Sequence, residues 1–111
     1  MIESLEVIQQ RTENIHCTND FLDSATGTLL LDGVCMKLIA TGESIKNLDK
    51  LTAGNLLIYY PQIPWREVMG MRDIIVHHYF DVDADVIFNT VKENIPLLMD
   101  TLLQMREDLK E

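Results

Sequence analysis

Apolar residues recur every three or four positions through most of the chain, the spacing of one face of an α-helix. A first run covers residues 2–16, and a second covers residues 24–51 with Asp23 or Ser24 as a suitable N-cap. Phe21 and Leu22, in the turn between the two runs, are expected to pack on the core. No segment alternates apolar and polar residues as a half-buried strand does.

The second half of the chain continues this pattern between clear breaks. Residues 52–55 end the long helix, residues 56–60 form a short turn, and Pro64 opens a helix predicted from Trp65 to about Phe80. A last helix begins near Asp83, and Pro96 predicts a kink or a restart near Asn94. The apolar side of this helix is expected to hold the following residues: Val86, Ile87, Val91, Ile95, Leu98, Leu102, Met105 and Leu109. The fold expected is an all-α up-and-down helical bundle of four to five helices.

Composition places the chain among ordinary globular proteins. Its 111 residues are 47% hydrophobic, which suits one domain over residues 1–111. No stretch is apolar enough for a membrane span or a signal peptide, and two cysteines are too few for a disulfide framework, so a cytoplasmic location is expected. Eighteen acidic residues against nine basic ones give a net charge of −9, which argues against a broad basic surface for nucleic acid but not against a small local cleft.

Glycines in the long helix need a reason, because each lowers helix propensity by roughly 1 kcal/mol relative to Ala. Gly33 and Gly42 are expected to allow another helix to approach closely.

The residues that can carry chemistry gather between Pro64 and Asp83. Residues three and four apart share a helix face, which sorts this segment into three stripes. The first is apolar and expected to face the core: Val68, Met71, Ile75 and His78. The second is apolar with one cation and one phenol: Trp65, Met69, Arg72, Val76 and Tyr79. The third is polar: Arg66, Gly70, Asp73 and His77.

Asp73 and His77 are four residues apart, so the carboxylate can accept a hydrogen bond from the imidazole and favour its charged form. Arg72 and His77 are about 140° apart around a straight helix, too far to converge on one small target. Either the last turn of the helix is distorted, or a second copy completes the site across a two-fold axis. The second is favoured, because four residues of the segment would make a self-complementary patch: Trp65, Met69, Val76 and Tyr79.

Simpler roles exist for each of these residues. His78 suits a hydrogen-bonded core histidine, Trp65 a packing anchor, and Arg72 an interface arginine paired with an acid. Tyr79 can be a half-buried aromatic whose hydroxyl reaches water. Asp73 with His77 is also a common pairing on a solvated helix face.

The sequence lacks the residues that several other kinds of functional site require. The acids Asp81, Asp83 and Asp85 have neither the glycine nor the bidentate glutamate of a calcium loop, and His16-Cys17 is too isolated for a metal site. No glycine-rich phosphate loop or G-x-S-x-G motif occurs. No metal and no cofactor are expected.

The run from Arg72 to Tyr79, R-D-I-I-V-H-H-Y, resembles the R-x-x-x-x-H-x-Y signature of HepT-like proteins in the HEPN superfamily. The preceding Y-P-Q-I-P-W-R-E-V-M-G-M, the following F-D-V-D and Gly42-Glu43-Ser44 are also similar to that family. The resemblance covers roughly Phe21 to Leu98. In the family the position occupied by Asp73 is polar, often Asn, and the extra negative charge here would slow cleavage.

The resemblance implies a dimeric, metal-independent ribonuclease in which Arg72 and His77 are catalytic, Asp73 assists, and Trp65, Arg66, Met69 and Val76 support the cleft or dimer. It also implies a toxin–antitoxin pair whose MNT-type nucleotidyltransferase antitoxin modifies Tyr79 with AMP. Two other classes stay open. The chain could be a non-catalytic binding subunit or modification substrate of the nucleotidyltransferase, which suits its acidity, or a plain helical dimerisation module.

Overall fold

The computed structural model describes residues 1–71, 73, 75 and 83–110, and these contain helices and turns but no strand. The elements in chain order are α1 (Ile2–Arg11), α2 (Asn19–Leu22), α3 (Ala25–Leu51), the 3₁₀ turn η1 (Leu57–Tyr59), α4 (Trp65–Met69), α6 (Ala84–Asn89), the π-helical turn η2 (Thr90–Asn94) and α7 (Ile95–Asp108). The predicted all-α bundle is confirmed. No helix in the described ranges is long and apolar enough to cross a membrane.

The long helix α3 has the bounds that the sequence predicts. Its N-cap is Ser24, whose hydroxyl accepts a hydrogen bond from the Gly27 N–H at 2.9 Å. It ends at Leu51, and Ala53 and Gly54 follow with φ values of 52° and 74°. Two consecutive residues in this left-handed region cannot continue a right-handed helix. The chain therefore leaves α3 where the sequence breaks.

Helix α1 is shorter than the predicted helix over residues 2–16, because the backbone groups that would form its next turn have other hydrogen-bond partners. In a longer helix the His16 N–H would donate to the Thr12 carbonyl. Instead His16 donates to the Asp20 carboxylate at 2.7 Å, and the Thr12 carbonyl accepts from Lys92 Nζ at 2.7 Å. Helix α1 ends at Arg11.

In the following turn, Phe21 is fully buried as predicted, but Leu22 is 53% exposed. Consecutive helical residues point about 100° apart, and in this short helix only Phe21 faces the core.

The core lies between α3, α1 and the last helical run. Its members come from all three, and a selection shows the spread: Leu5, Ile8, Leu38, Ile45, Leu98 and Leu102. Two residues predicted on the apolar side of the last helix are exposed, Val86 by 44% and Leu109 by 66%. Val86 is turned about 100° from the buried Ile87, and Leu109 follows the last residue of α7.

The last helical run begins and bends where the sequence predicts. Asp83 caps α6, its carboxylate accepting from the Asp85 N–H at 2.9 Å. The predicted kink or restart near Asn94 is confirmed, because the π-helical turn η2 ends there and α7 begins at Ile95. Pro96 lies at the start of α7 and has no N–H to donate to the preceding turn, which accounts for the change from η2 to α7 at this point.

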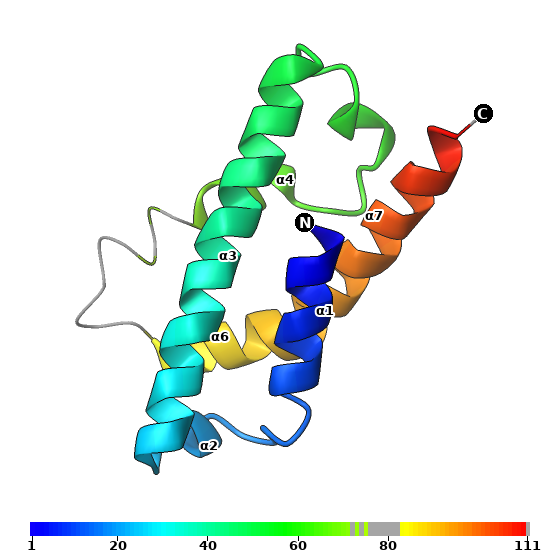
Figure 1. Ribbon diagram of the computed structural model, residues 1–111. Coiled ribbons are helices and arrows are strands. Elements are labelled where there is room, and N and C mark those ends of the chain that lie inside the picture. Colours follow the sequence, from blue (N-terminus) through cyan, green and yellow to red (C-terminus); the bar gives the residue numbers. More distant parts are fainter. Residues whose placement is uncertain (72, 74, 76–82, 111) are drawn as a thin grey trace.

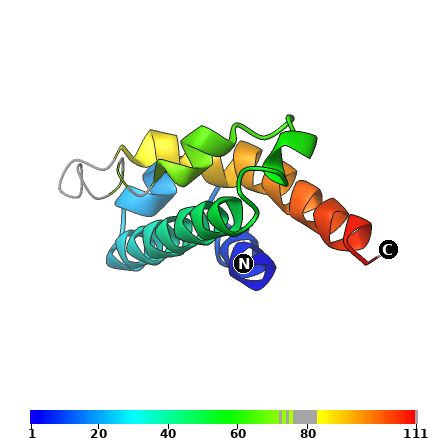
Figure 2. The same ribbon diagram turned by 90° about the horizontal axis from the view of Figure 1, so that it is seen from above.

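The helices are arranged as a thin plate measuring 46 × 27 × 19 Å. In Figure 1, α1 and α3 run in opposite directions side by side, and α7 passes on the other side of α1. Figure 2 shows α4 and α6 lying over α3, with α1 in the same layer as α3. The shortest dimension matches two helices of about 10 Å diameter. The plate therefore has two helical layers.

Candidate functional site

Helix α4 is anchored to the core at its first residue. Trp65 is buried, and its indole Nε1–H donates to the Tyr60 carbonyl at 2.9 Å. The Pro64 carbonyl accepts from the N–H groups of Glu67 and Val68 at 3.0 and 3.1 Å. These bonds close the first turn of the helix. Trp65 is therefore a packing anchor, as the simpler interpretation predicted.

The predicted helix from Trp65 to Phe80 is interrupted. Helix α4 ends at Met69, and Gly70 is its C-cap, with its N–H donating to the Arg66 carbonyl at 3.0 Å. Met71, Asp73 and Ile75 are helical again. Glycine is the weakest helix former after proline, so a break at Gly70 has a local cause. Gly70 is thus a signal in the sequence for the end of α4.

The described residues between Pro64 and Ile75 lie on the sides that the first and third stripes predict. Val68 and Met71 are partly buried against the core, and Ile75 is 2% exposed. Arg66 and Asp73 are exposed, so the polar stripe faces solvent where it is described. In the second stripe Trp65 and Met69 instead pack on the core of their own chain, so little of Trp65 is left for the self-complementary patch expected between two copies. The remaining predicted residues, Arg72, Val76, His77, His78 and Tyr79, lie outside the described residues.

Gly42 lets α4 lie directly on α3. A Cβ built at Gly42 would be 2.8 Å from the Val68 carbonyl oxygen, closer than real Cβ contacts come. The expectation of close approach is confirmed here. It is wrong for Gly33, whose Cβ would meet no described atom within 4 Å. This backbone contact at Gly42 fixes the position of α4, the helix that precedes Arg72.

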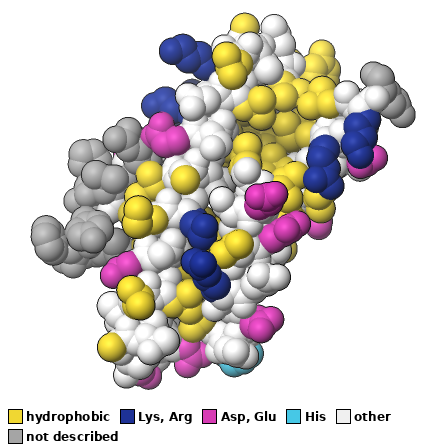
Figure 3. Space-filling model, viewed as in Figure 1, with side chains coloured by type: hydrophobic (Ala, Val, Ile, Leu, Met, Phe, Trp, Pro, Cys, Tyr) yellow, Lys and Arg dark blue, Asp and Glu magenta, His cyan; other side chains and the backbone are white. Residues whose placement is uncertain are grey.

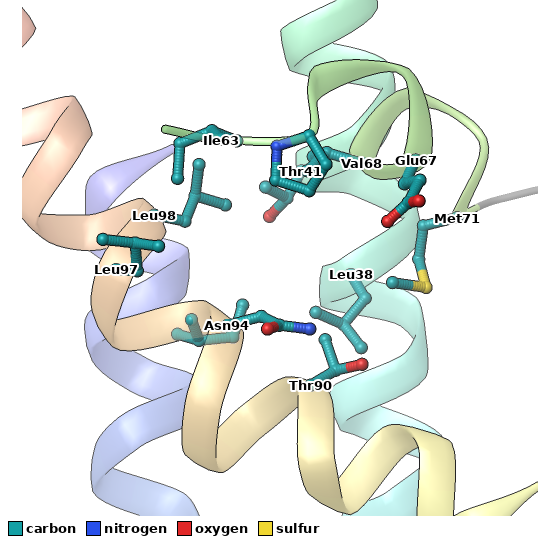
Figure 4. A pocket seen from close by; sticks show the side chains of 12 residues that line it. Leu38, Thr41, Ile63, Glu67, Val68, Met71, Thr90, Asn94, Leu97 and Leu98 are labelled. Carbon is teal, nitrogen blue, oxygen red and sulfur yellow. The ribbon is translucent and has the colours of Figure 1, made fainter. Parts of the chain in front are cut away.

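A small cavity opens between α3, α4, η2 and α7, with a volume of about 90 Å³ (Figure 4). Its walls are mainly apolar and include Leu38, Ile63, Val68, Met71, Ile95 and Leu98. Four polar side chains also line it: Thr41, Glu67, Thr90 and Asn94. Sequence reasoning missed this cavity, because its residues come from four separate elements. The only signal was the helix restart expected at Asn94.

Two of these four polar side chains already make hydrogen bonds within the protein. The hydroxyls of Thr41 and Thr90 donate to the carbonyls of Lys37 and Val86, each at 2.8 Å. The carboxylate of Glu67 and the carboxamide of Asn94 make no hydrogen bond with the described part of the chain. Figure 4 shows both directed into the opening from opposite walls.

Three acids outside the candidate motif, Asp20, Asp83 and Asp85, make hydrogen bonds that hold local structure. Asp83 caps α6, and Asp85 accepts a hydrogen bond from the Thr18 hydroxyl. Donation from the N–H groups of His16 and Cys17 holds the pKa of the Asp20 carboxyl below its usual value. Within the described ranges no three His, Cys, Asp or Glu residues are arranged to hold a metal ion.

A second, wider hollow lies on the face seen in Figure 3. Its volume is about 760 Å³, and apolar side chains from the ends of α1, α3 and α7 line it, with Glu3, Glu6 and Arg106 among its charged residues. The apolar members are Ile2, Leu48, Leu56, Leu102, Met105 and Leu109.

Comparison with known proteins gives consistent matches. The profile of the family described as Ribonuclease HepT-like matches residues 1–105. The probable ribonuclease HepT of Thermococcus cleftensis is 38% identical over 106 residues, covering 95% of this chain and 88% of that protein. A putative RNase of Caldanaerobacter subterraneus subsp. tengcongensis is 30% identical over 98 residues, covering 88% of this chain and 80% of that protein.

Another relative is longer than this chain. The gamma-glutamylcyclotransferase and putative RNase of Methanocaldococcus jannaschii is 35% identical over 109 residues, which are 98% of this chain but 46% of that protein. The chain therefore spans about half the length of that relative. No solved structure matches. Because the family profile covers nearly the whole sequence, the chain belongs to the HepT-like ribonuclease family.

Proposed function

We propose that this protein is a metal-independent endoribonuclease whose catalytic residues are Arg72 and His77, assisted by Asp73. The family supports this, and relatives named as ribonucleases match over most of the chain. The structural observation that carries the proposal lies inside the motif itself. Asp73 is exposed while Ile75 is 2% exposed, so the apolar side of the segment meets the core and its polar side is available to a substrate.

The motif has the groups that RNA cleavage without a metal requires. A base must remove the proton of the ribose 2′-OH, an acid must protonate the leaving oxygen, and a cation must stabilise the negative charge that develops on the phosphorane oxygens. A histidine near neutral pKa serves as base or acid. An arginine binds phosphate oxygens through two parallel hydrogen bonds.

The cleft is proposed to be composite, formed by two copies of the chain. Arg72 and His77 are five residues apart, about 140° around a helix, and a second copy brings a complementary pair. Arg66 is exposed beside the segment and can contribute phosphate contact. Met69 and Val76 are proposed to support the contact between the two copies. Trp65, buried within its own chain, supports the cleft by fixing the start of α4.

The biological setting proposed is a cytoplasmic toxin–antitoxin pair with an MNT-type nucleotidyltransferase. Adding AMP to the Tyr79 phenol would place bulk and negative charge two residues from His77, where an RNA phosphate must bind. A mass increment of one AMP on Tyr79, seen only when the chain is co-expressed with the nucleotidyltransferase, is the observation that would support this regulation.

The alternative is a non-catalytic subunit that binds the nucleotidyltransferase or serves as its substrate. The net charge of −9 favours it, because a protein this acidic repels RNA outside any local cationic cleft. In this alternative Tyr79 is still modified with AMP, but the protein does not cleave RNA.

An RNase assay with EDTA present tests the proposal. His77→Ala should lower cleavage by about 10²-fold or more, the usual contribution of a general acid or base. His16→Ala is the matched control, since His16 is exposed in the turn after α1 and should leave activity unchanged.

Equal cleavage by wild type and His77→Ala would show that His77 is not a catalytic residue. No cleavage by a folded dimer free of AMP would favour the binding subunit.

A further inference from the structure

The wide hollow of about 760 Å³ lies at the N-terminal end of α1. Helix α3 has 27 residues and α1 has 10, so the two helices are about 40 Å and 15 Å long. In Figure 1, α3 and α7 both extend past the start of α1. The hollow therefore continues the line of α1 between two longer helices, in a position that one more helix would fill.

The surface of the hollow is mainly apolar, as its lining residues show. Two of them are open to solvent, Leu109 by 66% and Met1 by 40%. Figure 3 shows the hydrophobic side chains gathered in this hollow, with acidic and basic side chains at its edges. A contiguous apolar surface with a polar rim is typical of an interaction site.

Hydrogen bonds hold the walls of the hollow in place. The Tyr60 hydroxyl donates to Asp108 Oδ2 at 2.6 Å, and Gln62 Nε2 donates to Thr101 Oγ1 at 3.4 Å. Both bonds join α7 to the connection that follows α3. A binding surface that is already formed avoids the entropy cost of ordering it when a partner binds.

The shape of the hollow favours a helix as its occupant. A second copy that presented the same hollow would leave an unfilled space between two concave surfaces, and an unfilled space loses packing contacts. One turn of a helix, with a pitch of 5.4 Å and a diameter of about 10 Å, occupies roughly 420 Å³. The hollow of about 760 Å³ therefore accommodates close to two turns.

The charges at the rim determine which helix suits the hollow. Glu3 and Glu6 line it from α1 and are three residues apart, so they share one face of that helix. Arg106 lines it from α7. Within residues 1–71, 73, 75 and 83–110, none of these three side chains makes an ion pair or a hydrogen bond. Their charges are therefore available to a partner.

We propose that the hollow binds an amphipathic helix of a partner protein, with the C-terminal end of that helix next to α1. Apolar side chains spaced three and four residues apart would pack on the floor of the hollow. Lys or Arg in the last turn, where the helix dipole favours a cation, would pair with Glu3 and Glu6. An acidic residue of the partner would face Arg106. No lining residue belongs to the segment between Pro64 and Asp83, so this inference does not depend on the ribonuclease.

A synthetic peptide tests the apolar contact. It has about 15 residues, enough for a marginally stable helix, with Leu every third or fourth position, Glu in its first turn and Lys in its last. Fluorescence anisotropy should show saturable binding of one labelled peptide per chain. Leu109→Gln should weaken binding about tenfold, because a side chain buried by the peptide becomes polar. Leu29→Gln is the matched control, since Leu29 is 72% exposed on α3 outside the hollow and should leave binding unchanged.

Leu109 is exposed, so its replacement should also leave the urea midpoint unchanged and keep the protein folded. No saturable binding, or equal binding by wild type and Leu109→Gln, would overturn the proposal. A wild-type oligomer that Leu109→Gln dissociates, without any peptide binding, would assign the hollow to a second copy and also overturn it.

A second pair of variants tests the charge contact. Replacing Glu3 and Glu6 together by Gln should weaken peptide binding about threefold, as expected for two solvent-exposed ion pairs. The same double variant should not affect a peptide whose lysines are replaced by glutamine. Replacing Glu13 and Glu93 together by Gln changes the net charge equally, outside the hollow, and should leave binding unchanged. Equal weakening by both double variants would show that only net charge acts, and would overturn the proposed orientation.

Discussion

At the scale of single residues, the two cysteines show how strongly position controls chemistry. Cys17 is exposed in the turn before α2, whereas Cys35 is buried in α3. Burial raises the pKa of the Cys35 thiol to about 11, and the carboxylate of Asp32 adds to this effect. Only the thiolate is nucleophilic, so Cys35 is almost entirely in its unreactive form near neutral pH.

Iodoacetamide should therefore label one cysteine of the folded protein. At about pH 8 we expect Cys17 to be alkylated and Cys35 to stay free, while both react in denaturant. Mass spectrometry of the digested protein measures this directly, with Cys17→Ser as the control. Equal labelling rates in the folded state would show that Cys35 is accessible.

Some residue roles could be predicted from the sequence because they depend on neighbours along one helix. Ile75 is buried and Asp73 exposed, as the stripes indicate. The cavity that Glu67 and Asn94 both line could not be predicted, since it depends on how α4 and η2 pack around α3. The functional assignments of Arg72, His77 and Tyr79 stay predictions.

At the scale of elements, the contact between α3 and α4 is made by backbone. Gly42→Ala gains about 1 kcal/mol of helix propensity, but its Cβ would overlap the Val68 carbonyl, a clash that typically costs about 1–3 kcal/mol. We expect a net loss of roughly 1 kcal/mol in the free energy of unfolding. Urea denaturation measures the change.

Gly33→Ala is the matched control on the same helix. Its Cβ meets no described atom within 4 Å, so the propensity gain should remain and stabilise the protein by about 0.5–1 kcal/mol. Stabilisation by both alanines would mean that α4 moves away from α3 without cost.

Element boundaries were predictable where a local signal acts alone. Ser24 caps α3, and Ala53 and Gly54, shortly after Leu51, have left-handed conformations that prevent the helix from continuing. The early end of α1 was not predictable, because Lys92, which is 80 residues further along, takes the carbonyl of Thr12. The break at Gly70 had a local cause, but the apolar periodicity on either side concealed it.

At the scale of the whole molecule, one side-chain link joins the connection after α3 to the end of α7. The Tyr60 hydroxyl donates to Asp108 Oδ2 at 2.6 Å, and Gln104 donates to the other oxygen at 2.7 Å. The bond from Tyr60 is the main cause of a lowered pKa for the Asp108 carboxyl. The same bond raises the pKa of the Tyr60 phenol.

These shifts define a pH window. A carboxyl with a lowered pKa stabilises the fold above its unfolded value of 3.8, and this contribution is lost as pH falls through the folded pKa. A phenol with a raised pKa stabilises the fold below its unfolded value of 10.0, and this contribution is lost as pH rises through the folded pKa. The link should therefore act between these limits.

Tyr60→Phe should remove the link. The pKa of Asp108 should return toward 3.8, and the loss of stability should be larger at about pH 7 than at about pH 3. NMR titration of the carboxyl and urea midpoints at the two pH values measure both effects. Tyr59→Phe is the matched control, since that side chain is 74% exposed. An Asp108 pKa unchanged by Tyr60→Phe would contradict this assignment.

The π-helical turn η2 has a consequence for comparing related chains. A π turn closes its hydrogen bonds over five residues where an α turn uses four, so it holds one residue more than the surrounding helix. Removing one residue between Thr90 and Asn94 would return this turn to α-helical spacing, while Pro96 would still interrupt the hydrogen bonds there. Because the wide turn absorbs its extra residue locally, α7 would keep nearly the same face toward the core. Relatives that lack one residue here would therefore keep matching core positions on both sides of the turn.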